Sequence, residues 1–172
     1  MLATKMDSPS PKRLFSEKIY WLHQLRGELP ETTLITDFTR PQNGAVRNQS
    51  VTFELEAPVS QAVLRLGQGS AVSVYVFLLS VVSLLLTRYT RRHDWVLGVP
   101  AYFPEGADEE ANAGANAALP LRGQIATDAS FKQVLLQTKA TLIDTYVHQT
   151  YPLESLYSQL GLQDGHRHPL FD

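Results

Sequence analysis

The stretch Leu86–Pro100 reads LTRYTRRHDWVLGVP and joins the two elements on which the fold depends. It contains the end of a long apolar helix, a solvated Arg-Arg-His-Asp turn, and a run, Asp94–Pro100, that is rich in β-branched and aromatic residues. Both alternating faces of Asp94–Pro100 are apolar, which is typical of an inner strand of a sheet. The stretch therefore predicts a helix followed directly by a buried strand.

The helix before this turn is predicted to lie in the core. Across Val74–Leu86 only Ser80 and Ser83 interrupt an apolar run. Together with Ser73 and Thr87 they fall on one narrow stripe, as in a helix that other elements surround. The apolar run is shorter than the roughly 20 residues that cross a bilayer as a helix. We therefore expect a buried helix and no membrane partner.

The same patterns extend along the chain in both directions. Apolar spacing and start signals predict further helices that begin at Leu14, Pro58, Ser130 and Pro152. Alternation predicts strands over Val51–Glu56, with one covered face, and around Ala118–Arg122. The predicted buried residues are Phe15, Ile19, Leu22 and Leu25 in the first helix, and Phe131, Leu135, Thr138, Leu142 and Tyr146 after Ser130. Interleaved helices and strands favour an α/β or α+β fold in two layers, with a flexible tail over residues 1–13 and one domain over residues 14–172.

Length, composition and charge exclude several classes of protein. A chain of 172 residues with 44% hydrophobic and 19% charged residues is ordinary for one soluble globular domain. The net charge of -2, with charges of both signs scattered, lacks the basic face that nucleic acid requires. The absence of cysteine excludes disulfides and thiolate chemistry and is compatible with a cytoplasmic location. Residues 1–13 lack the apolar run of a signal peptide.

The polar residues do not form a self-contained active site. His166-x-His168 has the spacing of metal ligands, but no cysteine supports it, so we expect no metal site. His148 follows a predicted helix and has two interpretations, a general base paired with Glu154 or Asp144, or a cap on the last helical carbonyls, which we favour. No nucleophile elbow and no phosphate loop is present. We therefore expect no catalytic residue and no cofactor of its own.

Six short motifs follow one another in an order that resembles one family. They are Tyr20-Trp21-Leu22-x-x-Leu25, Leu86-Thr87-Arg88-Tyr89-Thr90, Asp94-x-Val96-Leu97-Gly98-Val99-Pro100, Leu119-Pro120-Leu121-Arg122, His148-Gln149-x-x-Pro152-Leu153-Glu154 and Pro169-Leu170-Phe171. The order is similar to that in the C-terminal lobe of the condensation domain of nonribosomal peptide synthetases, which has the chloramphenicol acetyltransferase-like fold. The resemblance runs from about Leu14 to Phe171. It implies an incomplete C-terminal lobe with a mixed sheet packed by helices.

The resemblance also implies a function that this sequence does not complete. In the family, the N-terminal lobe carries a His-His-x-x-x-Asp-Gly motif whose second histidine assists amide formation, and this sequence has no adjacent pair of histidines. The resemblance therefore implies acyl or peptidyl transfer between carrier-protein thioesters only together with a complementary N-terminal lobe. Its expected partners are peptidyl carrier proteins, which would bring the phosphopantetheine, and other synthetase domains.

By the same resemblance, Gly98, Pro100 and Asn116 are candidate substrate-binding residues at the floor of the tunnel between the two lobes. The family's Phe-Val-Asn-Thr-Leu strand is matched by Ala115–Leu119, which has alanine at the asparagine position and asparagine one residue earlier. Core faces and sheet edges that the family covers are expected to be bare, which predicts a partner or a homodimer. Two alternatives stay open, a non-catalytic docking or dimerisation module and a degenerate fragment.

Overall fold

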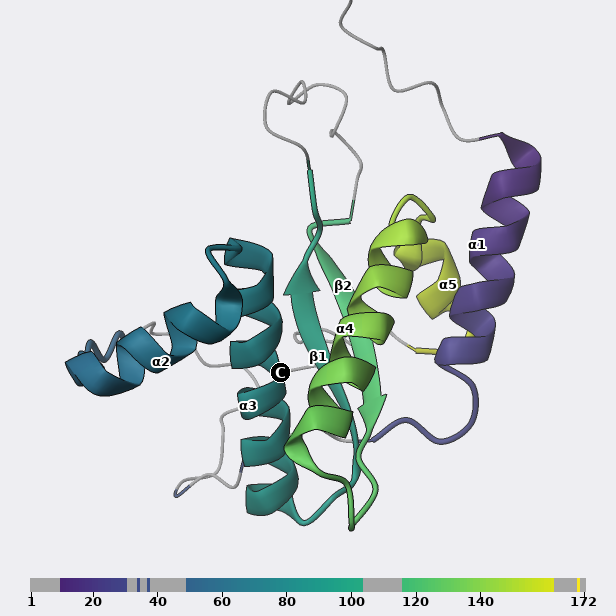
Figure 1. Ribbon diagram of the computed structural model, residues 1–172. Coiled ribbons are helices and arrows are strands. Elements are labelled where there is room, and N and C mark those ends of the chain that lie inside the picture. Colours follow the sequence, from purple (N-terminus) through teal and green to yellow (C-terminus); the bar gives the residue numbers. More distant parts are fainter. Residues whose placement is uncertain are drawn as a thin grey trace, which may run out of the picture. The chain divides into compact units, whose positions relative to one another are not determined.

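The computed structural model describes residues 10–30, 34, 37, 49–103, 116–162 and 170. The elements, in chain order, are α1 (Pro11–Gln24), α2 (Ala57–Gly67), α3 (Ala71–Thr90), β1 (Asp94–Pro100), β2 (Ala118–Gln124), α4 (Phe131–Val147) and α5 (Leu153–Gln159) (Figure 1). They form two compact units where the sequence predicts one domain. The first unit is Met1–Thr32, Val96–Arg122 and Ala140–Asp172, and the second is Thr33–Trp95 and Gly123–Lys139.

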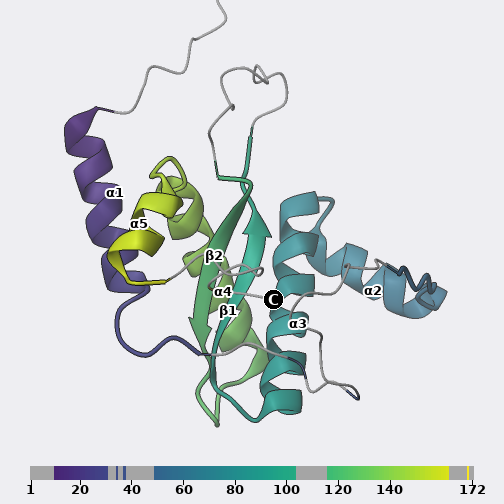
Figure 2. The same cartoon turned by 180° about the vertical axis from the view of Figure 1, so that it is seen from behind.

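In the first unit, helix α1 packs against α5, and the two lie side by side in both views (Figures 1 and 2). Helix α1 begins earlier than Leu14, because Ser10 Oγ accepts a hydrogen bond from Arg13 N at 3.3 Å and Pro11 takes the first turn. Residues 11–13, which the sequence analysis includes in the tail, form the first turn of this helix.

The buried face of α1 also differs from the prediction. Two residues that were predicted to be buried are exposed, Phe15 and Ile19. Glu17 is instead only 2% exposed, and Trp21 is fully buried. Burial of the Glu17 carboxylate is tolerated because Arg13 Nε lies 2.8 Å from one oxygen and the Thr150 hydroxyl lies 2.7 and 2.9 Å from the two oxygens. Apolar spacing does not reveal a buried carboxylate whose partner lies far along the chain.

In the second unit, α2 packs against α3 (Figures 1 and 2). Helix α2 has Pro58 in its first turn, as the sequence predicts. At its end, a Cβ on Gly67 would lie 2.5 Å from Val74 Cγ2. Glycine at this position therefore lets the end of α2 approach the start of α3.

Helix α3 buries a face that carries hydroxyl groups. Its buried residues are Val76, Leu79, Ser80, Ser83, Leu86 and Thr87. The hydroxyls of Ser80, Ser83 and Thr87 donate to backbone carbonyls four residues earlier at 2.7, 2.8 and 2.9 Å. They need no partner outside the helix. By length and composition alone α3 resembles a membrane-spanning helix, as do the core helices of many soluble proteins.

Strands β1 and β2 form an antiparallel two-stranded sheet (Figure 1). Ile125 N donates to His93 O at 2.8 Å, and Ala101 N donates to Ala117 O at 3.4 Å. These bonds set the register of the two strands. The predicted bounds of β1 are confirmed, whereas a second neighbour for this strand is not found among the described residues.

This register places Trp95 directly opposite Gly123. A Cβ on Gly123 would clash with Trp95 Cζ2, so the glycine leaves room for the indole ring to lie across the neighbouring strand. Trp95 is 4% exposed, and its Nε1 has no hydrogen-bond partner in the part of the chain that the structure describes. Among the described residues, packing holds the ring in place.

The predicted strand over Val51–Glu56 is wrong for this structure. These residues form no strand, and the three apolar members of the alternation are exposed, Val51, Phe53 and Leu55. Alternation determines which side chains share a face, but a strand forms only where another strand takes up its backbone hydrogen bonds. The described residues supply no such neighbour for this segment.

Helix α4 starts at the predicted capping box. Ser130 N donates to Gln133 Oε1 at 2.8 Å, and Gln133 N donates to Ser130 Oγ at 3.4 Å. The predicted buried face is correct only in part. The buried residues are Val134, Thr138, Leu142 and Thr145. Phe131 is exposed, although it contacts Phe77 edge-on at the start of the helix, with ring centroids 5.4 Å apart.

We predict that Gly123→Ala lowers the free energy of unfolding by about 1–3 kcal/mol, the usual effect of overpacking, because the new methyl group meets the indole of Trp95. Urea unfolding followed by circular dichroism measures this change. Trp95→Phe in both backgrounds is the matched control, since a smaller ring reduces the penalty of the alanine. An equal penalty in both backgrounds would contradict the proposed contact.

Candidate functional site

The three residues that the resemblance assigns to substrate binding lie at one end of the sheet, within the first unit. Gly98 and Pro100 lie on the same face of β1, and both are exposed. Asn116 comes just before β2 and lies opposite Tyr102 in the register set by the backbone bond between Ala101 and Ala117. The structure thus brings together residues that are separated in the sequence.

Asn116 holds the turn between α4 and α5. Its Nδ2 donates to Gln149 O at 2.9 Å and to Tyr151 O at 2.7 Å. Its Oδ1 accepts from Leu153 N at 3.1 Å, which satisfies one of the backbone N–H groups at the start of α5. Because the amide is engaged through both of its ends, Asn116 acts on this region through the backbone that it positions.

Gln149 connects the same turn to the segment after β1. Its Oε1 accepts from Tyr102 N at 2.9 Å, and its Nε2 donates to Tyr102 O at 2.8 Å. The amide side chain therefore gives Tyr102 both bonds that a neighbouring strand would give. The ring of Tyr102 also lies 5.7 Å, between centroids, from the ring of Tyr146 on α4. The His-Gln motif has a structural role here.

His148 makes the contacts of a helix cap. Its Nδ1 lies 2.7 Å from Asp144 O, and since a carbonyl only accepts, this nitrogen donates. The imidazole stacks on the Tyr20 ring with centroids 3.9 Å apart and planes inclined by 7°. The backbone oxygen of His148 accepts from Trp21 Nε1 at 2.8 Å. These contacts match the capping interpretation and join the end of α4 to α1.

Arg122, the last residue of the Leu-Pro-Leu-Arg motif, binds the chain that follows α1. Its guanidinium donates to Gln24 O at 3.3 Å, to Arg26 O at 2.8 Å and to Glu28 O at 3.0 Å. Gln24 Nε2 donates in return to Arg122 O at 3.1 Å. The last carbonyl groups of a helix have no hydrogen-bond donor within the helix. Arg122 donates to one of them, Gln24 O, and to two carbonyls of the segment that follows α1. The arginine therefore fixes the path of the chain after α1.

Two tyrosines in this unit, the buried Tyr157 and the half-buried Tyr20, stay protonated well above neutral pH. Burial raises the pKa of Tyr157 to about 12, and the nearby Glu154 carboxylate adds to the effect. Burial also raises the pKa of Tyr20, although its hydrogen bond to Thr145 opposes the change and the Asp144 carboxylate adds to it. Both hydroxyls are therefore neutral hydrogen-bonding groups at physiological pH.

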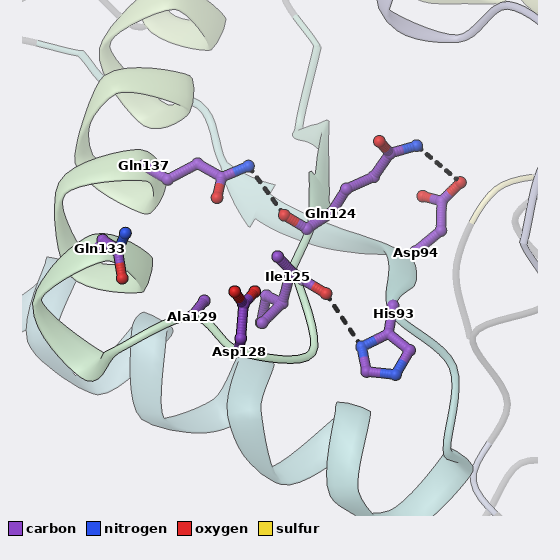
Figure 3. A pocket seen from close by; sticks show the side chains of 9 residues that line it. His93, Asp94, Gln124, Ile125, Asp128, Ala129, Gln133 and Gln137 are labelled. Atoms are coloured by element: carbon purple, nitrogen blue, oxygen red, sulfur yellow. Dashed lines mark hydrogen bonds between the residues drawn. The ribbon is translucent and has the colours of Figure 1, made fainter.

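A hollow of about 660 Å³, lined by both polar and apolar groups, lies in the second unit (Figure 3). It is lined by His93, Asp94, Gln124, Ile125, Ala126, Asp128, Ala129, Gln133 and Gln137. Several of these groups bind one another. Gln124 Nε2 donates to Asp94 Oδ2 at 3.3 Å, Gln137 Nε2 donates to Gln124 O at 2.8 Å, and His93 Nδ1 donates to Ile125 O at 2.9 Å. The hollow contains none of the three predicted substrate-binding residues.

The expectation that the chain has no metal site is tested only in part. In the part of the chain that the structure describes, no group of three potential metal-ligating side chains occurs. The His166-x-His168 pair lies outside the described residues, as do Pro169 and Phe171 of the last motif.

Sequence reasoning missed three residues that organise the two units, Glu17, Arg122 and Trp95. The helical spacing of Arg13 and Glu17 was the available signal for their ion pair. Arg122 was noticed as part of a motif, but its carbonyl partners lie far along the chain. No local sequence pattern predicts that Gly123 on the neighbouring strand makes room for the ring of Trp95.

We predict that Asn116→Ala lowers the free energy of unfolding by about 2–3 kcal/mol, because two backbone carbonyls and one backbone N–H lose their partner together. Urea unfolding measures the loss. Gln149→Ala is the comparison variant. It removes the two exposed bonds to Tyr102, so its effect should be smaller. A larger effect of Gln149→Ala would contradict the central role given to Asn116.

We also predict that stability falls as the pH rises from about 10 to about 12. In this range the unfolded chain releases the Tyr157 proton while the folded protein retains it, since the folded pKa is raised. Tyr157→Phe removes this ionisation and should flatten the alkaline decline. Urea midpoints at pH 9, 10 and 11 measure the difference. Parallel declines in the two proteins would show that Tyr157 does not contribute.

Curated proteins similar to this chain are large peptide synthetases. The chain is 30% identical both to surfactin synthase subunit 1 of Bacillus subtilis (strain 168) and to tyrocidine synthase 3 of Brevibacillus parabrevis, over 158 residues in each case. The two alignments each cover 91% of this chain, but only 4% of the first relative and 2% of the second. The chain therefore spans a small part of the proteins it matches.

A solved structure and a family match agree with this likeness. A complex of the X-domain and OxyB from teicoplanin biosynthesis superimposes with a TM-score of 0.73 at 22% identity, covering 92% of this chain and 35% of that chain. The shared fold is the chloramphenicol acetyltransferase-like α/β fold of condensation domains. The family described as Condensation domain matches residues 7–172. The chain therefore belongs to the condensation-domain family.

Proposed function

We propose that this chain is an incomplete C-terminal lobe of a nonribosomal peptide synthetase condensation domain. It contributes to acyl or peptidyl transfer between carrier-protein thioesters when a complementary lobe supplies the histidine motif. The observation that carries the proposal is a family match over residues 7–172 in a sequence without an adjacent pair of histidines.

The chemistry of the reaction supports a second polypeptide segment. The acceptor amine attacks the donor thioester carbonyl, a C–N bond forms, and the C–S bond breaks to release the thiol of the donor carrier. A base must receive the amine proton as the new bond forms. This sequence lacks the adjacent pair of histidines that carries the base in the family's motif. We therefore assign the base to the complementary lobe and no catalytic residue to this one.

The substrates would arrive on phosphopantetheine arms of peptidyl carrier proteins. Gly98 and Pro100 face outward at the end of the sheet that Asn116 and Gln149 hold in place. We assign to Gly98 and Pro100 the lining of the substrate tunnel, and to Asn116 the positioning of the turn beside it. The family's synthetase context also supports a cytoplasmic location and partners among other synthetase domains.

A second candidate function is a non-catalytic docking or dimerisation module. It is favoured by the lack of an adjacent pair of histidines in this sequence. The fold is shared with a domain that occurs in complex with OxyB. Under this candidate, the chain binds synthetase components, or a second copy of itself, and the histidine motif is not needed for its role.

The decisive experiment mixes this chain with a condensation-domain fragment that carries His-His-x-x-x-Asp-Gly. Donor and acceptor carrier proteins are loaded with amino acids, and the dipeptidyl thioester is measured by mass spectrometry. We expect product only from the mixture, and none when the second histidine of the fragment is replaced by alanine. Product from the chain alone would contradict the proposal. A stable complex without product would favour the docking module.

In the active mixture, we predict that Gly98→Val reduces product formation by about tenfold or more, because the side chain enters the space proposed for the pantetheine arm. The strand backbone tolerates valine, since Gly98 does not have a positive φ. Lys132→Ala, an exposed change on α4, is the control and should leave the rate unchanged. Equal rates for wild type and Gly98→Val would remove Gly98 from the proposed site.

A further inference from the structure

Strand β1 has β2 on one edge only, and we refer to its other edge as the open edge (Figure 1). In an antiparallel pair, opposite residues alternate between those that exchange both backbone hydrogen bonds and those that exchange none. The bonds at the two ends of this sheet join odd-numbered residues, Ile125 to His93 and Ala101 to Ala117. The even-numbered residues of β1 therefore direct their N–H and C=O groups toward the open edge.

Tyr102, two residues beyond the end of β1, continues the line of the open edge. Its N–H donates to Gln149 Oε1 at 2.9 Å, and its C=O accepts from Gln149 Nε2 at 2.8 Å. One amide group thus binds both backbone groups of a single residue. The structure therefore contains an example of amide recognition on the line of the open edge.

Gly98 offers the same pair of backbone groups on the open edge. In the part of β1 that belongs to the first unit, Val96 is fully buried and Pro100 has no N–H. Gly98 lies between them and is exposed. Among the described residues, no group binds its N–H or C=O on this edge. Because glycine has no side chain, another molecule can approach its backbone closely.

We infer that the N–H and C=O of Gly98 bind the β-alanyl unit of a pantetheine arm. The inference rests on the proposed function and names the part of the arm that this chain recognises. The β-alanyl unit has an N–H and a C=O that are separated by two methylene groups. When the unit bends at these methylene groups, its N–H and C=O point to the same side, as in a strand residue. Gly98 N then donates to the carbonyl of the arm, and the N–H of the arm donates to Gly98 O.

A peptide strand fits the open edge less well. A peptide that adds to a sheet pairs with every second residue along the edge. Here Pro100 cannot donate, Gln149 already binds both groups of Tyr102, and Val96 is buried. The open edge therefore offers one complete pair of groups, which suits a thin arm with one matching unit. Binding of a peptide is one outcome of the test.

Amide NMR spectra of the isotope-labelled full chain, titrated with D-pantetheine, test the contact. The chain has no cysteine, so the thiol of pantetheine cannot form a mixed disulfide with it. We expect the Gly98 signal to shift with a dissociation constant in the millimolar range, because two neutral hydrogen bonds give a small net free energy. The Tyr102 signal should change little, because Gln149 holds its N–H.

A modified ligand tests the inference on the unchanged protein. In this analogue an ester oxygen replaces the N–H of the β-alanyl unit, so that Gly98 O loses its donor. We expect the analogue to bind about tenfold more weakly than pantetheine. Equal binding of the two ligands would overturn the inference.

Two variants at position 98 test the protein side of the contact. Gly98→Pro removes the N–H that points to the open edge, and it removes no bond to β2. It should weaken pantetheine binding by about tenfold. Gly98→Ala keeps both backbone groups and is the matched control, with an expected change of less than about threefold. Equal losses in the two variants would contradict the contact, and unchanged signals from β2 verify that each variant is folded.

The outcomes separate this inference from the proposed function. Pantetheine binding at Gly98 without amide formation in the mixture of lobes would support the inference and contradict the proposed function. Amide formation in that mixture, with no shift of the Gly98 signal, would overturn the inference and leave the proposed function standing. If an acetylated tripeptide of valine and threonine shifts the Gly98 signal at lower concentration than pantetheine does, the open edge binds a peptide strand and the inference is wrong.

Discussion

The second unit depends on the hydrogen bonds that Ser80, Ser83 and Thr87 make to the backbone of their own helix. Because these hydroxyls are satisfied internally, α3 can bury them without polar partners on neighbouring elements. Val76, Leu79 and Leu86 are buried on the same face, whereas Leu78, Val82 and Leu85 lie on the opposite side and are exposed. These bonds within the helix thus explain how α3 buries three hydroxyl groups.

In the first unit, the turn after α4 has the corresponding role. His148 contacts Tyr20 and Trp21, Thr150 binds Glu17, and Asn116 holds the backbone on the other side of the turn. The turn therefore connects α1, α5 and the end of the sheet. Four motif residues serve this network, Tyr20, Trp21, His148 and Gln149. Gly98 and Pro100 lie beside this network and are exposed. Their exposure is compatible with the substrate-binding role that we propose for them.

Helices and strands that are specified by neighbouring residues could be predicted from the sequence. The capping box at Ser130, the first-turn proline of α2 and the strand Asp94–Pro100 depend on neighbouring residues, and the structure has all three. Buried faces were less predictable. The burial of Glu17 requires Thr150, and the exposure of Phe15 and Ile19 follows from that choice of face. The strand over Val51–Glu56 failed because pairing needs a second strand, which alternation cannot supply.

The sequence by itself determined most of the helices and strands, the family and the lack of a histidine pair, because composition, spacing and caps act between neighbouring residues. Only the tertiary structure decided which side of each helix is buried, that Asn116 and Arg122 bind backbone carbonyls, and that the outer side of α3 is bare. The physical reason is that burial and hydrogen bonding over long sequence separations depend on which surfaces meet. A local sequence pattern does not identify the distant residue that it will contact.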